Sequence, residues 1–252
     1  MKTSRIFCIA VLCLAAWPAQ AQPAEDGRFA RVFQITPKDT ARAQFADDYR
    51  NYLNTRRTRR DPWKWYGWQV TSGPHTGAII NGTFDHFWSD FDATAPTDIT
   101  DNLAGFLPSA DFLFHYYLLF LPEASRLKKL EDSITTQPYA VAEYYELWPG
   151  REHDFEELLH RTRDAYKRAR VPRNYFCYRV FNGGRQPAYV ILTPYERPAD
   201  MQLFERGFTA VWDETLALND AATLREVFRL AVREMSSETL RLRGDLSYLP
   251  GG

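Results

Sequence analysis

Cysteine is scarce in this 252-residue sequence, which contains it at positions 8, 13 and 177. Two of the three fall in the opening segment MKTSRIFCIAVLCLAAWPAQA, which has the basic residues Lys2 and Arg5, a short apolar run, and small residues at a typical cleavage position. We therefore predict that residues 1–21 are a cleaved export signal and that the mature protein is periplasmic or secreted. The mature chain would keep Cys177 alone, could form no internal disulfide, and would depend on its apolar core for stability.

An excess of charge is also absent. The sequence has 31 Lys and Arg residues against 32 Asp and Glu residues, and without the signal the balance is 29 against 32. This balance argues against nucleic acid or an anionic membrane as a general partner. The later apolar run 112–121 covers about half of the length that a transmembrane helix needs, and it contains His115. We predict no nucleic-acid partner and no membrane insertion after signal cleavage.

Common catalytic motifs are missing as well. The sequence contains no GxSxG, no phosphate-cradling glycine loop, no CxxC and no HExxH, so the corresponding hydrolase, nucleotide, redox and zinc-protease classes have no support. His153 and His160 share one face of a predicted helix, and the run FDHFWSDFD offers oxygen and nitrogen ligands. Both patterns are more typical of solvated helix faces than of metal sites. We predict neither a metal nor a cofactor.

What the sequence does contain is an internal repeat. Placing Pro62 over Pro172 aligns DPWKWYGWQVTSGPHTGAIINGT with VPRNYFCYRVFNGGRQPAYVILT without a gap. Each segment predicts a hairpin, because an aromatic and β-branched strand is followed by a glycine-containing turn and a second strand. RVFQITPKD and YYELWPGRE precede helical patterns at matching places upstream. Each half therefore begins as strand, helix, strand, strand.

The remaining segments complete two similar units. In the first half Phe84, Phe87, Trp88 and Phe91 recur at helical spacing, and DFLFHYYLLFLP predicts a final strand. In the second half residues 198–218 and 221–237 are predicted to be helical, and TLRLRGDLSYLP predicts a final strand. The expected fold class is α+β, with two tandem ferredoxin-like β-α-β-β-α-β units at 28–123 and 138–248 and a connection at 124–137.

This repeated pattern resembles the dimeric α/β-barrel superfamily, which includes NIPSNAP-type proteins, EthD-like proteins and cofactor-independent monooxygenases. The resemblance rests on element order and the repeat, without a diagnostic motif. It implies that the antiparallel sheets of the two units face each other as an α/β barrel and enclose a pocket, while activities vary among members. Two units in one chain could close the barrel internally, so either a monomer or a homodimer is expected.

Alternation along the strands predicts which side chains share that pocket. We assign the bulky rows to the helix-covered faces: Phe33 and Ile35, Tyr145 and Leu147, Tyr66-Trp68-Val70, Phe176-Tyr178-Val180, the even positions from 112 to 120, and Leu240 and Leu242. The opposite rows then form a polar and aromatic inner set. Its members are Gln34, Trp65, Gln69, Asn81, His115, Tyr117, Glu146, Tyr175, Arg179 and Arg241.

Three functions are consistent with this inner set. An exported binding module could hold a small polar or anionic molecule between aromatic walls, with Arg179 or Arg241 fixing it. A cofactor-independent monooxygenase or isomerase-like enzyme could use His115 as acid or base. A structural or interaction protein of the cell envelope could use Glu146 and Arg179 simply as an ion pair between strands.

Overall fold

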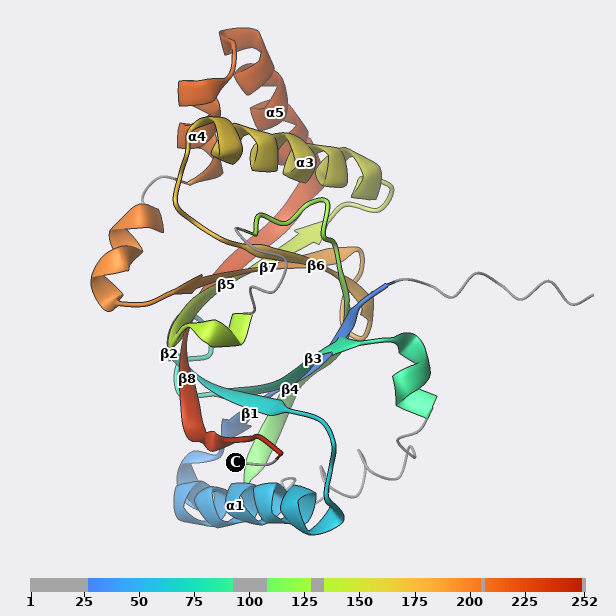
Figure 1. Ribbon diagram of the computed structural model, residues 1–252, viewed down its shortest axis with the longest axis vertical. Helices are drawn as coiled ribbons and strands as arrows, with labels where there is room; N and C mark the ends of the chain where they lie inside the picture. Colours follow the sequence, from blue (N-terminus) through green and yellow to red (C-terminus); the bar gives the residue numbers. More distant parts are fainter. Residues whose placement is uncertain (1–26, 93–107, 128–133, 205–206, 251–252) are drawn as a thin grey trace, which may run out of the picture.

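The computed structural model describes residues 27–92, 108–127, 134–204 and 207–250 (Figure 1). Its strands close into one antiparallel barrel in the order β1-β3-β2-β8-β5-β7-β6-β4. The strands are β1 (Phe29–Pro37), β2 (Trp65–Ser72), β3 (Ile79–His86), β4 (Ala110–Phe120), β5 (Tyr139–Leu147), β6 (Phe176–Asn182), β7 (Ala188–Tyr195) and β8 (Val232–Tyr248). The helices are α1 (Arg42–Arg59), α3 (Glu152–Arg168), α4 (Phe208–Thr215) and α5 (Leu218–Ala231). Within the described residues, no helix is long and apolar enough to cross a bilayer.

Helices cover the barrel from two sides. In Figure 1, α1 lies below the strands of the first half, and α3, α4 and α5 lie above those of the second. Beneath α1, an aromatic layer contains Tyr49, Tyr52, Phe33 and Trp65. Beneath α3 to α5, a larger layer is built around buried residues such as Trp212. Each strand of the barrel is therefore buried on both faces in part of its length.

Two long strands join the halves. Strand β4 pairs with β1 of its own half and with β6 of the other, while β8 pairs with β5 and with β2. Gly67 permits the β2–β8 contact, because a Cβ there would meet the backbone and side chain of Leu246. Closure of the barrel therefore depends on two strands that each pair with a strand of the other half.

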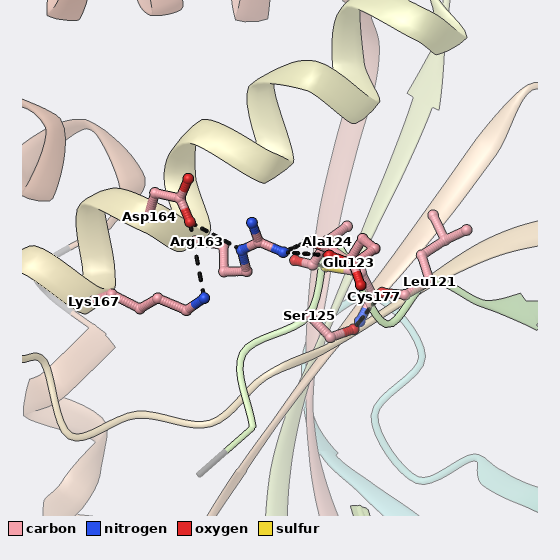
Figure 2. A network of polar contacts seen from close by, with 8 residues as sticks. All are labelled: Leu121, Glu123, Ala124, Ser125, Arg163, Asp164, Lys167 and Cys177. Atoms are coloured by element: carbon pink, nitrogen blue, oxygen red, sulfur yellow. Dashed lines mark hydrogen bonds and ion pairs between the residues drawn. The ribbon is translucent and has the colours of Figure 1, made fainter. Parts of the chain in front are cut away.

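The segment after β4 is tied to the second half by polar contacts (Figure 2). Arg163 on α3 donates hydrogen bonds to the backbone oxygen and carboxylate of Glu123. Ser125 Oγ donates to Leu121 O at 2.7 Å and accepts from Cys177 N at 2.8 Å. The Cys177 thiol donates to Ala124 O at 3.3 Å, and burial raises its pKa. A buried protonated thiol of this kind is unreactive.

The predicted element order is largely found, with three differences. The aromatic pattern from Phe84 gives the end of β3 and a short 3-10 helix, Trp88–Asp92, rather than an α-helix. The region 198–218 divides into a 3-10 helix, Pro198–Phe204, and α4. Residues Val232–Ser237, predicted to be helical, are strand, because pairing with β5 overrides their local preference. Part of the predicted connection, 128–133, lies outside the described residues.

The largest difference from the prediction concerns which side chains point into the barrel and which point toward the helices. Most of the bulky rows that we expected beneath helices instead fill the barrel, namely Tyr66, Trp68, Val70, Phe114, Tyr116, Leu118, Phe120, Phe176, Tyr178, Val180, Leu240 and Leu242. An eight-stranded barrel is just wide enough to be filled by its own side chains. Large apolar residues are therefore needed on both faces, and bulk does not distinguish them. The assignment of Phe33, Ile35, Tyr145 and Leu147 to helix-covered faces is confirmed.

Candidate functional site

Most of the predicted inner set lies on the outer face of the barrel. In the first half, Trp65 packs in the α1 layer and its indole N–H donates to Asp61 Oδ2 at 3.0 Å. Asn81 exchanges hydrogen bonds with the hydroxyls of Tyr49 and Tyr52, both on α1. The predicted facing of Trp65 and Asn81 is wrong, because closing the barrel turns the Trp68 row inward and this row outward.

The same correction applies to the polar residues near β8. Gln69 lies opposite the inward-facing Trp68 and Val70, and its Oε1 accepts a hydrogen bond of 2.8 Å from Arg243. Arg241 alternates with Leu240 and Leu242, both of which face the interior. Gln69 and Arg241 therefore point outward.

In the second half, Tyr175 and Arg179 lie on the side of α3. Tyr175 is buried in the helix-covered layer, with its ring 5.6 Å from that of Tyr166. Arg179 Nη1 lies 3.4 Å from Glu156 Oε1 on α3. The suggested ion pair between Glu146 and Arg179 does not form, since Glu146 instead pairs with Arg185 and Arg233.

His115 and Tyr117 also face outward, from β4. Arg31 Nε donates to His115 Nε2 at 3.0 Å, and burial together with the Arg31 charge lowers the pKa of His115 from 6.5 to about 4. Tyr117 packs edge-on against Trp88 and Phe91 at 5.4 and 5.2 Å. His115 is therefore held neutral, with Nε2 occupied by the guanidinium, and is poorly placed to accept a proton.

Two predicted residues, Gln34 and Glu146, do point into the barrel, and Gln34 leads to a polar cluster. Glu238 is 2% exposed, and Gln34 Nε2 lies 3.4 Å from both of its carboxylate oxygens. His75 Nδ1 lies 2.7 Å from Glu238 Oε1, and the Tyr144 hydroxyl donates to Oε2 at 3.2 Å. Burial and the nearby carboxylate raise the pKa of Tyr144 well above its usual value, so this hydroxyl remains a donor. We call these four residues the Glu238 cluster.

The cluster borders a cavity of about 210 Å³ at one end of the barrel. Its walls include Phe114, Tyr116, Tyr144, Val190 and Ala188, and its outer part carries the charged residues Glu146, Arg185 and Glu234. We call it the mouth cavity. Deeper in the barrel the packing is tight, and the apolar space beside Trp68 and Leu118 measures about 30 Å³, room for no more than a few waters.

Sequence reasoning missed three members of the cluster. Glu238 followed a segment assigned to a helix, and Tyr144 adjoins the helix-facing Tyr145. His75 lies in the β2–β3 turn, which the sequence identified only as a connection. A signal existed on β8, where Glu238 shares the inward-facing row of Leu240 and Leu242, but it is readable only when the strand is extended backwards past Thr239.

Comparisons with known proteins agree with this architecture. No family model and no curated protein matches the sequence. Among solved structures, an anthrone oxidase-like protein is 14% identical, with 91% of this chain and 96% of that one covered, at a TM-score of 0.55. A candidate monooxygenase from Lactobacillus acidophilus is 10% identical, with 90% and 98% covered, at a TM-score of 0.51. A haem-binding protein from Thermus thermophilus is 10% identical, with 87% and 92% covered, at a TM-score of 0.50.

Chlorite dismutases also match the fold. The chain thus has the architecture of the broad class of α/β-barrel proteins that includes monooxygenase-like and chlorite dismutase-like members. At these identities the likeness concerns the fold alone, and the chemistry must come from this chain's own residues.

The haem-binding neighbour raises the question of whether the mouth cavity could hold a haem. Haem iron needs an axial His, Cys, Met or Tyr, and ligand pockets for molecules of drug size usually measure about 300–1,000 Å³. The mouth cavity, at about 210 Å³, is smaller than this range and lacks the room for a macrocycle of haem size. No group of three or more potential metal ligands occurs among the described residues. The mouth cavity does not fit a haem.

Proposed function

We propose that this protein binds a small molecule in the mouth cavity and that His75 and Glu238 act there as a proton-transfer pair. The observation that carries the proposal is the burial of Glu238 inside the barrel, within hydrogen-bond distance of His75 and at the wall of a cavity. Buried carboxylates are costly unless they are paired or used, and such groups concentrate at functional sites.

The geometry suits proton transfer. When the Glu238 carboxylate is ionised it can only accept, so His75 Nδ1 then carries the proton and Nε2 keeps its lone pair. A carboxylate at one ring nitrogen fixes the tautomer and the orientation of the imidazole. Because the His75 side chain is 45% exposed, Nε2 can reach a molecule that enters the cavity.

An enzyme of the cofactor-independent monooxygenase or isomerase kind is the second candidate, favoured by the fold shared with an anthrone oxidase-like protein and a candidate monooxygenase. Its acid or base was predicted to be His115. The outward position of His115 and its contact with Arg31 favour His75 for that role instead. A purely structural role, in which the Glu238 cluster only closes the barrel, is the third.

Narrower assignments are also proposals. Two tandem ferredoxin-like units are supported by the matching strand orders β4-β1-β3-β2 and β8-β5-β7-β6. Membership of the NIPSNAP or EthD type would require shared motif residues. Export, with a periplasmic or secreted mature protein, rests on the pattern in residues 1–21, and amino-terminal sequencing of the expressed protein would test cleavage after Ala21.

Ligand-detected NMR with a panel of small aromatic acids, alcohols and amines would test the binding proposal. Ala188→Leu should abolish binding, because Ala188 lines the mouth cavity and the larger side chain would fill it. Ala43→Leu on the exposed face of α1 is the matched control and should bind as wild type does. Failure of the whole panel to bind wild type, or equal binding by both variants, would refute a ligand site in this cavity.

Proton transfer has a separate test with 5-nitrobenzisoxazole. A base removes its C3 proton, the N–O bond breaks, and a coloured cyanophenolate forms. Since a positioned base typically contributes about 10²-fold or more, wild type should exceed His75→Gln and Glu238→Gln by at least that order. Equal rates in folded proteins would leave a binding protein without the proposed chemistry.

A further inference from the structure

The Glu238 cluster has an unusual balance of hydrogen-bonding groups. Among the described residues, the ion-pair partner of Glu238 is His75, and no Lys or Arg lies within ion-pair distance of its carboxylate. Gln34 is fully buried and turns Nε2 toward Glu238, which leaves its Oε1 without a hydrogen-bond partner at the cavity wall. The reverse amide orientation would place two acceptors together, so the orientation is fixed chemically. The inner cavity therefore offers the hydrogen-bond acceptors of Glu238 and Gln34, and no donor within the described part of the chain bonds to Gln34 Oε1.

Aromatic rings line the same space. Phe114 and Tyr116 stack with ring centroids 4.2 Å apart and planes 6° from parallel, and Tyr144 meets Phe114 edge-on at 6.2 Å. Ring faces attract cations, and the attraction strengthens where water is excluded. Glu238 and these rings thus complement a positive charge.

The charged residues around the cavity, like the aromatic rings, favour a positively charged ligand. Three carboxylates, those of Glu146, Glu234 and Glu238, line it against the single guanidinium of Arg185. Arg185 is exposed and lies between Glu146 and Glu234, at 3.6 and 3.7 Å, and Arg233 also pairs with Glu146. These two arginines compensate the carboxylates of the rim and not Glu238 in the interior. An anion entering the cavity would meet a buried carboxylate with no fixed cation beside it, a costly arrangement.

We propose that the ligand of the mouth cavity is a small organic cation, a primary or secondary ammonium on a short aromatic or apolar body. This inference rests on the small-molecule site proposed above. The ammonium N–H groups donate to Glu238 and to Gln34 Oε1. The body lies against Phe114, Tyr116 and Tyr144. This replaces the polar or anionic ligand expected from the sequence, because the arginines invoked there lie on the outer face of the barrel.

Three probes of similar size test the charge preference by isothermal titration: benzylammonium, benzyl alcohol and benzoate. Benzylammonium should bind at least about tenfold more tightly than benzyl alcohol, and benzoate should bind least, since one desolvated charge contact is worth that order of affinity. Benzyltrimethylammonium keeps the charge but has no N–H group, so it should bind less tightly than benzylammonium if Gln34 Oε1 takes part. Equal affinity for the amine and the alcohol would overturn the cation proposal.

Variants separate this inference from the proposed function. Glu238→Gln should weaken benzylammonium about tenfold or more while leaving benzyl alcohol nearly unchanged. Glu234→Gln removes an exposed rim carboxylate and is the matched control, with an expected change of about twofold or less because exposed charges are screened. If alcohol and amine bind equally in every folded variant, the cavity stands and the cation preference fails. If no probe binds wild type, the proposed function fails with it.

Discussion

His115→Gln should flatten the dependence of stability on pH between 7 and 5. In the folded protein, burial and the Arg31 charge lower the pKa of His115 from 6.5 to about 4. Below pH 6.5 the unfolded chain takes up a proton that the folded protein does not. His115 therefore contributes stability that is complete above pH 6.5 and is lost as the pH falls toward 4.

The size of this effect follows from the shift. Each unit of pKa is worth about 1.4 kcal/mol, so a fully expressed shift would cost wild type about 2 kcal/mol on going from pH 7 to pH 5. His115 is only partly buried, and solvent screening reduces the expected loss to about 1 kcal/mol. Glutamine lacks the titrating nitrogen, but its Oε1 can still accept the hydrogen bond from Arg31 Nε.

Urea unfolding at pH 7 and pH 5 would measure the difference. The free energy of unfolding should fall by about 1 kcal/mol less in His115→Gln than in wild type. Tyr117→Phe, on the same face of β4, is the control and should follow wild type. Burial also lowers the pKa of His86, but that contribution is present in all three proteins and cancels. An acid-induced loss in His115→Gln as large as in wild type would refute the assignment of a neutral, Arg31-bound His115.

Two further perturbations test the fold. Gly67→Ala should lower the free energy of unfolding by about 2 kcal/mol or more in thermal unfolding, because the added Cβ would lie 2.6 Å from Leu246 Cβ. Gly244→Ala on β8 is the control and should be nearly neutral, because its Cβ meets nothing within 4 Å. Equal effects of the two substitutions would argue against the close β2–β8 contact. A thiol reagent should modify native Cys177 at least about hundredfold more slowly than the urea-unfolded chain, and comparable rates would contradict its burial and hydrogen bond to Ala124.

The repeat was enough to predict the strands but not the direction of their side chains. Aligning Pro62 with Pro172 correctly paired Trp68 with Tyr178, and both lie in the same core. Facing could not be read from these residues, because a barrel strand under a helix is buried on both sides and large rings occur on both. On β1 the polar Gln34 stands among apolar neighbours, and its predicted position facing the barrel interior is correct. On β2 the outer row contains Trp65 and Gly67, which look no more exposed than Trp68.

The Glu238 cluster could not be found from the sequence because its members come from four separate elements. Gln34 comes from β1, His75 from the β2–β3 turn, Tyr144 from β5 and Glu238 from β8. Glu238 lies where β8 passes from β5 to β2, since Ala142 pairs with Glu238 and Ser72 pairs with the next residue, Thr239. Neither half alone contains the carboxylate together with all of its partners. The cluster therefore exists only in the closed barrel, so a variant that opens the β2–β8 seam, such as Gly67→Ala, should weaken ligand binding even where the individual halves keep their structure.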